Sequence, residues 1–457
     1  MYIKDFIQDD LKAKEEMKTA VRYYNVEHDI LKHNFNEFEV DGLKIIDPNQ
    51  ANQKVAYGFF SLLVDQKVQY IVGKPTTVNS NNEELNEKIN EMLQEKFDYV
   101  LTDWVEGSSI KGVEWLHPYI DEEGNFDYVI IPAEQIIPIY DMSYKKQLER
   151  IIRYYLIDYY EGEKKFKRYR VEEWTASEVV YYIETESGDF VEEYRKPHWV
   201  IFNTAFPDSI ESRSWGKIPF IELKNNSRKK SDLHRIKRII DAYDLINSGA
   251  QNNQIDIQLA IWVLKGYSGT DLSEFMQNLK KYKAMKVDER GSVESQSIQI
   301  PIESQKFMLA ELEKKIYELG QGVDMGVDSF GAAPSGIALN FLYSGLDGKS
   351  NKMILNLKSA LKEFMWFVIQ YINERDNTNY ENDTWFSVNK TMLTNETEKI
   401  QNAANSVGIV SMRTIRENHP FVDDVNWEKE QLQKEQKERM NEILSQSVGD
   451  IDDDIAT

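Results

Sequence analysis

Apolar positions at helical spacing dominate the first hundred residues. From Val55 to Ile71, apolar side chains recur at steps of three and four, the period of one face of an α-helix. We predict a helix there that is stopped by Gly73 and Pro75. A second stripe predicts a helix over 82–97, and residues 10–100 as a whole are predicted to be mostly helical. The members of the second stripe are Leu85, Ile89 and Leu93.

From Gly112 the period changes to two, which is typical of β-strands with one buried face. Turn residues at 121–125 and 186–189 separate the segments and predict a meander. Ten of the 25 tyrosines lie between Tyr140 and Tyr194. Because tyrosine is frequent in strands and packs across them, we interpret this run as sheet packing rather than as a base-stacking surface. The predicted strands are 112–120, 125–141, 150–160, 164–174, 178–186 and 189–195.

Two long helices frame a compact α/β insertion. Ser231 is placed to cap a helix over 231–258 whose second half, past Ser248, is polar. A long helix without an apolar stripe bridges through solvent or packs on copies of itself, which is a first indication of a ring. The second helix, over 304–321, is expected to return beside the first. The insertion 259–303 is predicted to contain strands at 260–266, 283–289 and 297–303 and a helix at 271–282.

Glycine is concentrated after the second helix. Seven of the 22 glycines lie between Gly320 and Gly348, and the stretch ends in Gly-Lys-Ser. A phosphate-binding loop needs a glycine where Tyr343 stands, and it needs a strand before it, which the pattern does not predict. We therefore exclude a P-loop and predict a glycine-rich loop over 322–335 that leads into a helix over 336–373.

Composition narrows the chemistry. The 457 residues include no cysteine, so disulfides, thiolate metal sites and a cysteine nucleophile are excluded. The net charge of −22 disfavours a static nucleic-acid binder, although it does not disfavour a protein past which DNA must slide. The six histidines have no metal-site spacing and no nucleophile motif occurs, so we predict no enzymatic activity, no metal and no cofactor.

Neither end of the chain shows a targeting or binding pattern. The charged N-terminal stretch MYIKDFIQDD is unlike a secretory signal, and no apolar run approaches the length of a membrane span. After residue 390 the pattern is helical and charged. We predict that the acidic tail at 450–454 is solvated and disordered, since it lacks the glycine and the final glutamate of a calcium loop.

Six blocks, in order, resemble the portal proteins of tailed double-stranded DNA phages, of the type found in siphophages of Gram-positive hosts. Together the blocks lie between about residues 50 and 373. They are LVDQKVQYIVGKP (63–75), GSSIKGVEWLHPYIDEEGNF (107–126), PAEQIIPIYD (132–141), SDLHRIKRIIDAYDLINS (231–248), VLKGYSGTDLSEFMQNLKKYKAMKVDE (263–289) and SGIALNFLYSGLD (335–347).

The resemblance implies an α+β fold of the portal type, mainly helical, with long stem helices, a β-rich wing region and a small α/β clip insertion, in a ring oligomer. The implied segments are a wing over 1–230 that is β-rich at 112–222, stem helix 1 over 231–258, the clip over 259–303, stem helix 2 over 304–321, a channel (tunnel) loop over 322–335, a wing helix and connection over 336–390, and a crown-like helical C-terminus with an acidic tail over 391–457.

Three groups of residues follow from this assignment. The loop would present acidic and apolar groups to DNA, and its glycines would give it conformational freedom and mobility. The loop candidates are Gly322, Asp324, Met325, Gly326, Asp328, Phe330, Gly331, Ala333 and Ser335. The basic candidates on the stem are Lys314, Lys315, Arg235, Lys237 and Arg238. The candidate partner surface of the clip consists of Tyr267, Asp271, Glu274, Lys280, Lys281 and Lys283.

The function implied by the resemblance is a portal ring, dodecameric, at one capsid vertex of the virion, assembled in the host cytoplasm. Its partners would be the terminase large subunit, a head–tail adaptor, scaffold and major capsid proteins, and the double-stranded DNA in the channel, with no membrane. It would serve genome packaging, head–tail joining and DNA ejection. Two alternatives stay open from the residues alone: an enzyme with an unmarked carboxylate pair in the β-rich region, and another virion or scaffold protein.

Overall fold

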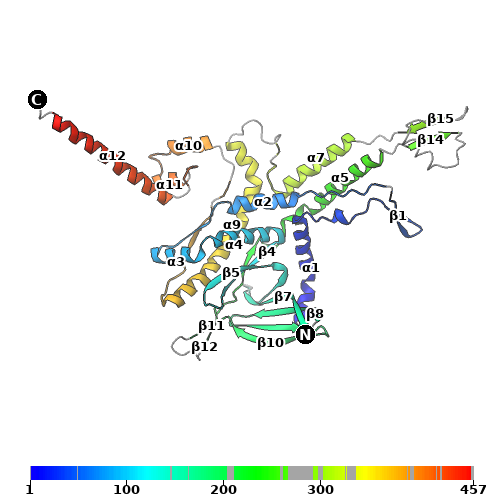
Figure 1. Cartoon of the computed structure of the whole chain (residues 1–457), viewed down its shortest axis with the longest axis horizontal. Coiled ribbons are helices and arrows are strands. Elements are labelled where there is room, and N and C mark those ends of the chain that lie inside the picture. Colours follow the sequence, from blue (N-terminus) through cyan, green and yellow to red (C-terminus); the bar gives the residue numbers. More distant parts are fainter. Residues whose placement is uncertain are drawn as a thin grey trace. The chain divides into compact units, whose positions relative to one another are not determined.

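The computed structural model describes residues 2–48, 50–144, 147–162, 164–202, 210–257, 261–265, 292–296, 302–324, 326, 336–388, 390–391, 396–417, 419–422 and 425–453 (Figure 1). The chain is a mixture of helices and strands in two compact units. The first unit is formed by Met1–Asp324 and Gly345–Thr391, and the second by Met325–Ser344 and Met392–Thr457.

Helices form the centre of the first unit. The buried side of α9 is an apolar stripe at helical spacing, and its Phe364 packs against Phe97 and Tyr128. The helices are α1 (Tyr2–Tyr24), α2 (Phe59–Val72), α3 (Glu83–Leu93), α4 (Lys96–Lys111), α5 (Lys237–Ile257), α7 (Ile302–Gly320) and α9 (Gly336–Asp376), of which the part from Gly345 belongs to this unit, with short 3₁₀ turns η1 (Asp29–Lys32), η2 (Ala133–Gln135) and η3 (Asp232–Arg235). The stripe consists of Met353, Leu357, Leu361, Phe364, Val368 and Ile372.

The helical prediction for residues 10–100 is wrong in two places. Helix α2 begins at Phe59, so Val55 and its neighbours are not helical. A hairpin of β1 (Glu37–Val40) and β2 (Leu43–Ile46) also interrupts the predicted helical region. Its two turn residues, Asp41 and Gly42, both have positive φ, as a tight hairpin turn requires. The Asp-Gly pair was the sequence signal for this turn.

The strands divide into two main sheets rather than one meander. Strands β6 to β10 form a five-stranded antiparallel meander as predicted, whereas β4 and β5 pair with β13 in a separate sheet. Trp115, Trp174 and Phe220 lie in one buried cluster with residues from both sheets. The strands are β4 (Val113–Ile120), β5 (Phe126–Ile131), β6 (Ile136–Tyr140), β7 (Leu148–Glu161), β8 (Lys164–Trp174), β9 (Glu178–Glu184), β10 (Phe190–Pro197) and β13 (Ile221–Lys224).

The remaining strands form short two-stranded sheets. β3 (Thr77–Asn79) pairs with β16 (Trp385–Ser387), and β11 (Trp199–Phe202) pairs with β12 (Ile210–Arg213). In the insertion, β14 (Ile261–Lys265) agrees with the predicted strand at 260–266. Its partner is β15 (Ser292–Gln296). The predicted strand at 297–303 is wrong at its end, because α7 begins at Ile302.

Helix α7 runs back along α5, and the two helices are in contact (Figure 1). In the second unit, the helices α10 (Glu396–Asn405), α11 (Met412–Glu417) and α12 (Val425–Asp453) confirm a helical C-terminal segment. The prediction of a disordered tail is wrong for residues 450–453, because these residues belong to α12. Among the described helices, none is long and apolar enough to cross a membrane.

A test of the fold uses two glycines with left-handed backbone. Gly112 (φ +93°) and Gly124 (φ +88°) both occupy a conformation that costs an L-residue about 1 kcal/mol or more. A Cβ at Gly112 would also collide with the backbone carbonyl of Lys229, whereas a Cβ at Gly124 would meet nothing within 4 Å. We expect Gly112→Ala to lower the free energy of unfolding by about 3 kcal/mol and Gly124→Ala by about 1 kcal/mol.

Urea unfolding followed by tryptophan fluorescence measures both variants under one condition. Equal losses of stability for the two variants would contradict the close approach of the 228–231 segment to Gly112.

Candidate functional site

A buried ion cluster joins four elements where α5 and α7 meet the body of the first unit. The ammonium group of Lys67 on α2 lies 3.1 Å from Asp232 in η3, and that of Lys349 on α9 lies 2.8 Å from the same carboxylate oxygen. Asn225 donates to the other oxygen of Asp232 at 2.9 Å and accepts a hydrogen bond from Lys67. The Lys349 ammonium also donates to the carbonyl of Gly320, the last residue of α7, at 3.0 Å.

The pKa values of Lys67 and Asp232 are both shifted by burial and by the charges of their partners in this cluster. Burial lowers the pKa of Lys67 to about 8, even though Asp232 opposes the effect. Burial by itself would raise the pKa of Asp232, but the charges of Lys349 and Lys67 hold that pKa well below its ordinary value. The carboxylate therefore stays ionised at neutral pH. Removing one partner of such a buried pair leaves an uncompensated charge, which is costly.

The Gly-Lys-Ser sequence thus has a structural role. Lys349 lies within helix α9 rather than at the start of a helix, and its ammonium is occupied by Asp232 and the Gly320 carbonyl. The C-terminal carbonyls of a helix carry partial negative charge, so a lysine there stabilises the end of α7. This placement agrees with the exclusion of a P-loop.

The end of α7 is fixed closely against α2. Gly322 donates to the carbonyl of Tyr317 at 3.1 Å, and Gln321, with φ +55°, takes the left-handed position of this C-cap. The side-chain amide of Gln66 binds both backbone groups of Val323. It donates to the Val323 carbonyl at 2.7 Å and accepts from the Val323 N–H at 3.0 Å.

This geometry corrects the predicted role of Gly322. Its φ is not among the positive values, and a Cβ on Gly322 or on Gly320 would collide with the side chain of Leu63. Glycine is therefore needed here for close approach to α2, not for mobility. The residue that does adopt the left-handed conformation is Gln321.

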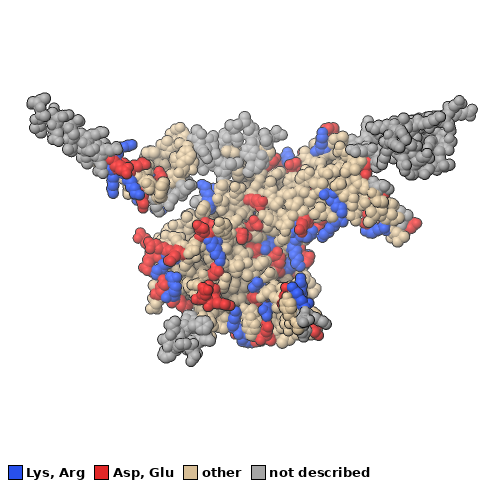
Figure 2. Space-filling model, in the orientation of Figure 1, with Lys and Arg blue, Asp and Glu red and all other residues tan. Residues whose placement is uncertain are grey.

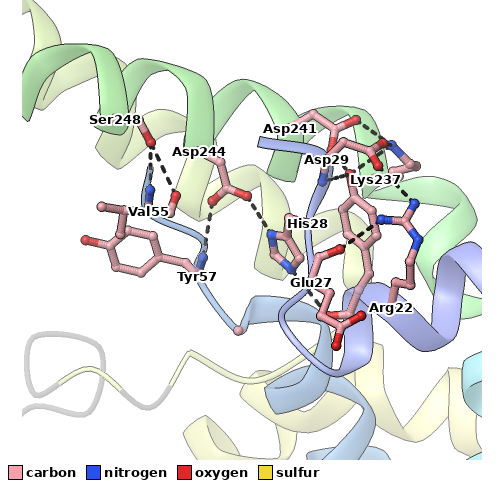
Figure 3. A network of polar contacts seen from close by, with 12 residues as sticks. Arg22, Glu27, His28, Asp29, Val55, Tyr57, Lys237, Asp241, Asp244 and Ser248 are labelled. Carbon is pink, nitrogen blue, oxygen red and sulfur yellow. Dashed lines mark hydrogen bonds and ion pairs between the residues drawn. The ribbon is translucent and has the colours of Figure 1, made fainter. Parts of the chain in front are cut away.

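Polar side chains along α5 bind an extended segment of the same chain, residues 51–57, and Figure 3 shows two of these contacts, at Val55 and at Tyr57. Side chains spaced four residues apart on the helix bond alternate backbone groups of this segment. Four residues of helix and two residues of extended chain both advance about 6 Å, so the two periods match. The pairs are Asp256 to the N–H of Ala51 at 2.9 Å, Asn252 to that of Gln53 at 2.6 Å, Ser248 to that of Val55 at 3.0 Å and Asp244 to that of Tyr57 at 3.2 Å.

This ladder corrects two interpretations of the sequence. The backbone around Val55 is extended because α5 side chains satisfy its N–H groups, which overrides the apolar helical spacing. The polar stripe of α5 is likewise not evidence for a ring, because residues 51–57 cover it within one chain. The signal that could have revealed the ladder is the i, i+4 repeat of short polar residues from Asp244 to Asp256.

A second polar network closes the start of α5. His28 approaches Asp244 to 2.6 Å, and both side chains are fully buried. Lys237 lies 2.7 Å from Asp29 and 2.8 Å from Asp241, and its ammonium also donates to the hydroxyl of Tyr23 (Figure 3). Burial alone would lower the pKa of Lys237, but the bonds to Asp241 and Asp29 raise it above its ordinary value. This predicted stem lysine therefore has structural partners.

The other basic candidates predicted for the stem are exposed on α7 and around the start of α5. Lys315 pairs with Glu318 one turn along α7 at 2.5 Å, while Lys314 and Arg238 form no ion pair within the part of the chain that the structure describes. Arg235 donates weakly to Gln321 at 3.5 Å, so it lies beside the end of α7. The structure does not bring these residues into one cluster.

The basic stretch 228–238 borders a cavity of about 770 Å³ between α1, the two main sheets and the start of α5. Lys229 pairs with Glu222, and Lys230 pairs with Glu16 at 2.7 Å. Figure 2 shows basic side chains gathered over α1 and the start of α5, beside acidic ones. Two of the lysines in this basic stretch are therefore neutralised by carboxylates of the same chain. Among the described residues, no group of histidine and carboxylate side chains could hold a metal ion.

Two groups of predicted site residues lie outside the described residues. In the loop, Gly322, Asp324 and Gly326 are described. The loop residues that are not described are Met325, Asp328, Phe330, Gly331, Ala333 and Ser335. All the clip candidates are also outside: Tyr267, Asp271, Glu274, Lys280, Lys281 and Lys283.

Comparison with known proteins identifies the protein family to which the chain belongs. The family model described as "Phage portal protein, SPP1 Gp6-like" matches residues 3–442. The chain is 32% identical over 451 residues to the portal protein of Bacillus phage SPP1, covering 96% of this chain and 88% of that protein. It is 31% identical over 450 residues to the portal protein of Clostridium phage phiCD119, covering 95% of each.

The chain is therefore a phage portal protein. It belongs to the SPP1 Gp6-like family, in agreement with the resemblance inferred from its sequence blocks. Among solved structures, it is similar to a chain in the "Neck of native GTA particle computed with C12 symmetry" at 10% identity, with a TM-score of 0.41 over 78% of this chain and 88% of that one.

The ion cluster can be tested with two lysines on α9. Lys349→Met removes a partner of the buried Asp232 and leaves the end of α7 without its cation, so we expect the free energy of unfolding to fall by about 3 kcal/mol. Lys352 is exposed on the same helix, and Lys352→Met should cost less than about 0.5 kcal/mol. Urea unfolding compares the two variants. A Lys349→Met variant as stable as its control would contradict the role of the cluster.

The contact at the end of α7 can be tested by a double-mutant cycle. Gly322→Ala forces a methyl group into Leu63 and should cost about 2 kcal/mol. Leu63→Ala creates space there, so the double variant should be more stable than the sum of the single effects predicts, by at least about 1 kcal/mol. Additive losses in unfolding experiments would instead mean that Gly322 does not need its close approach to Leu63.

Proposed function

We propose that this chain assembles into the ring-shaped DNA channel at one vertex of a phage capsid. The observation that supports this function most strongly is the family match, which extends over residues 3–442 and is accompanied by two portal proteins at 31–32% identity. In this role the ring is a dodecamer that passes double-stranded DNA inward during packaging and outward during ejection. The protein is structural and has no chemical step of its own.

The proposed segments follow the elements of the chain. Helices α5 and α7 are the stem, and the segment 259–303 between them, which includes β14 and β15, is the clip. The clip is the proposed docking surface for the terminase large subunit and later for a head–tail adaptor. The sheets and α9 form the wing, and α10 to α12 take the position of the crown. Scaffold and major capsid proteins contact the assembled ring during assembly in the host cytoplasm.

The proposed channel loop over 322–335 is held firmly where it begins. The Gln66 side chain fixes Val323 to α2, and Lys349 fixes the end of α7 to Asp232. Motion of the loop would therefore start after Asp324. A force on the loop would be transmitted to α2 and α9 through these contacts, because α7 cannot slide without breaking them.

The charge of the chain suits passage of DNA without retention. With a net charge of −22, the protein as a whole repels phosphates, and the proposed loop offers carboxylates and apolar groups rather than a basic clamp. Exposed Lys314 and Lys315 are then the proposed weak phosphate contacts of the stem. Weak contacts leave shallow energy wells, so DNA can translate along the channel.

The ring is tested directly by particle mass. We expect mass photometry of the purified chain to show particles of about twelve subunits, and negative-stain electron microscopy of the same sample to show a central hole. A well-formed small oligomer without a hole would refute the portal function and would favour the enzyme alternative.

The stem lysines are tested in a phage complemented with portal variants. Replacing Lys314 and Lys315 together with Ala should leave ring formation intact, because both side chains are exposed, and should change the amount of packaged DNA. Lys306→Ala is the matched control, since Lys306 is exposed on the same helix and pairs with Glu303. A packaged-DNA yield equal to that of the control would remove these lysines from the channel mechanism.

A further inference from the structure

The hairpin of β1 and β2 is amphipathic and turns its apolar face to solvent. Phe38 is directly opposite Ile45, and Leu43 lies two residues from Ile45 on the same strand, so the three side chains share one face. They are exposed by 44% for Phe38, 42% for Ile45 and 70% for Leu43. The opposite face carries Glu37, Glu39 and Lys44 together with Ile46.

A two-stranded hairpin with an uncovered apolar face is not stable by itself in water. This hairpin is nevertheless held in a defined place. At its base, Asn36 and Asp47 exchange two hydrogen bonds of 2.9 and 3.1 Å, and Asn52 accepts from the N–H of Phe35 at 3.0 Å. Through residues 51–57 the base is tied to α5 by the ladder. The hairpin is therefore a fixed projection beside the stem helix.

Helix α7 has exposed apolar side chains on the other side of α5. Phe307 and Met308, which are adjacent in this helix, are 68% and 46% exposed, and Phe307 lies opposite the buried Ile316 on the helix. Figure 1 shows α7 along one side of α5 and the hairpin on the opposite side, and α5 contacts both α7 and η1, which precedes the hairpin. The hairpin cannot cover α7 of its own chain, because α5 lies between them.

We propose that the apolar face of the β1–β2 hairpin docks on the exposed side chains of Phe307 and Met308 on α7 in a neighbouring copy of this chain. A closed ring needs a head-to-tail interface, in which two different surfaces on opposite flanks of one subunit meet. The hairpin and α7 are two such surfaces. The identity of the partner rests on the proposed function, since in a ring each copy is flanked by further copies of the same chain.

Cross-linking tests this interface without a background, because the chain contains no cysteine. The test protein carries Leu43→Cys and Phe307→Cys in one chain and is treated, as the assembled ring, with a short bismaleimide. Each copy then has one reactive group on each flank, so we expect a ladder of covalent multimers beyond the dimer on a denaturing gel. Each single variant should stop at the monomer or dimer.

The matched control pairs Leu43→Cys with Tyr99→Cys. Tyr99 lies on α4 and is 73% exposed, so its thiol is equally reactive but is not part of the proposed interface. Rings that form normally but give no more multimers with the Leu43–Phe307 pair than with the control would overturn the docking proposal and leave the portal function intact. A wild-type chain that forms no ring would overturn both.

A second measurement does not depend on cross-linker geometry. Leu43→Ser changes an exposed side chain, so the folded subunit should keep its stability while the fraction of rings at limiting concentration falls at least tenfold. Glu39→Ser, on the opposite face of the same hairpin, should leave the ring fraction within twofold of wild type. Equal ring fractions for the two variants in mass photometry would count against the proposal as directly as an absent ladder.

Discussion

The ionised carboxylate of Asp232 is the point on which the arrangement of α5 and α7 depends. It is held by Lys67 from α2 and Lys349 from α9, and Lys349 in turn holds the last carbonyl of α7. One buried charge thus fixes η3, directly before α5, and the end of α7 relative to the body of the first unit. Since a buried charge is tolerated only when it is paired, each of these elements constrains the rest.

Contacts to α2 extend this constraint toward the glycine-rich segment. A Cβ on Gly320 or Gly322 would collide with a terminal methyl group of Leu63, and Gln66 binds both backbone groups of Val323. The segment therefore starts from an anchored point. This anchoring matters for the proposed channel, because a loop transmits force to its subunit only where its ends are fixed.

Patterns in the sequence predicted the local elements well and the long-range contacts poorly. The period-two pattern predicted strand β8 with the bounds that the structure shows, and the helical pattern predicted the start of α9 at Gly336. The predicted start of α2 was wrong, because side chains of α5, about two hundred residues away in the sequence, determine the backbone conformation around Val55. The hairpin at Asp41-Gly42 had a local signal that was missed. The cluster at Asp232 could not be predicted, since Lys67 lies 165 positions away.

The ladder between α5 and residues 51–57 has a built-in limit of length. Two residues of extended chain advance about 6.2–6.8 Å, whereas four residues of helix advance about 6.0 Å, so each further rung adds a misfit of about 0.2–0.8 Å. Over the span from Asp244 to Asp256 the misfit approaches the tolerance of a hydrogen bond. The two periods therefore stay in step over only a short span, which limits the ladder between the segment and α5 to a few rungs.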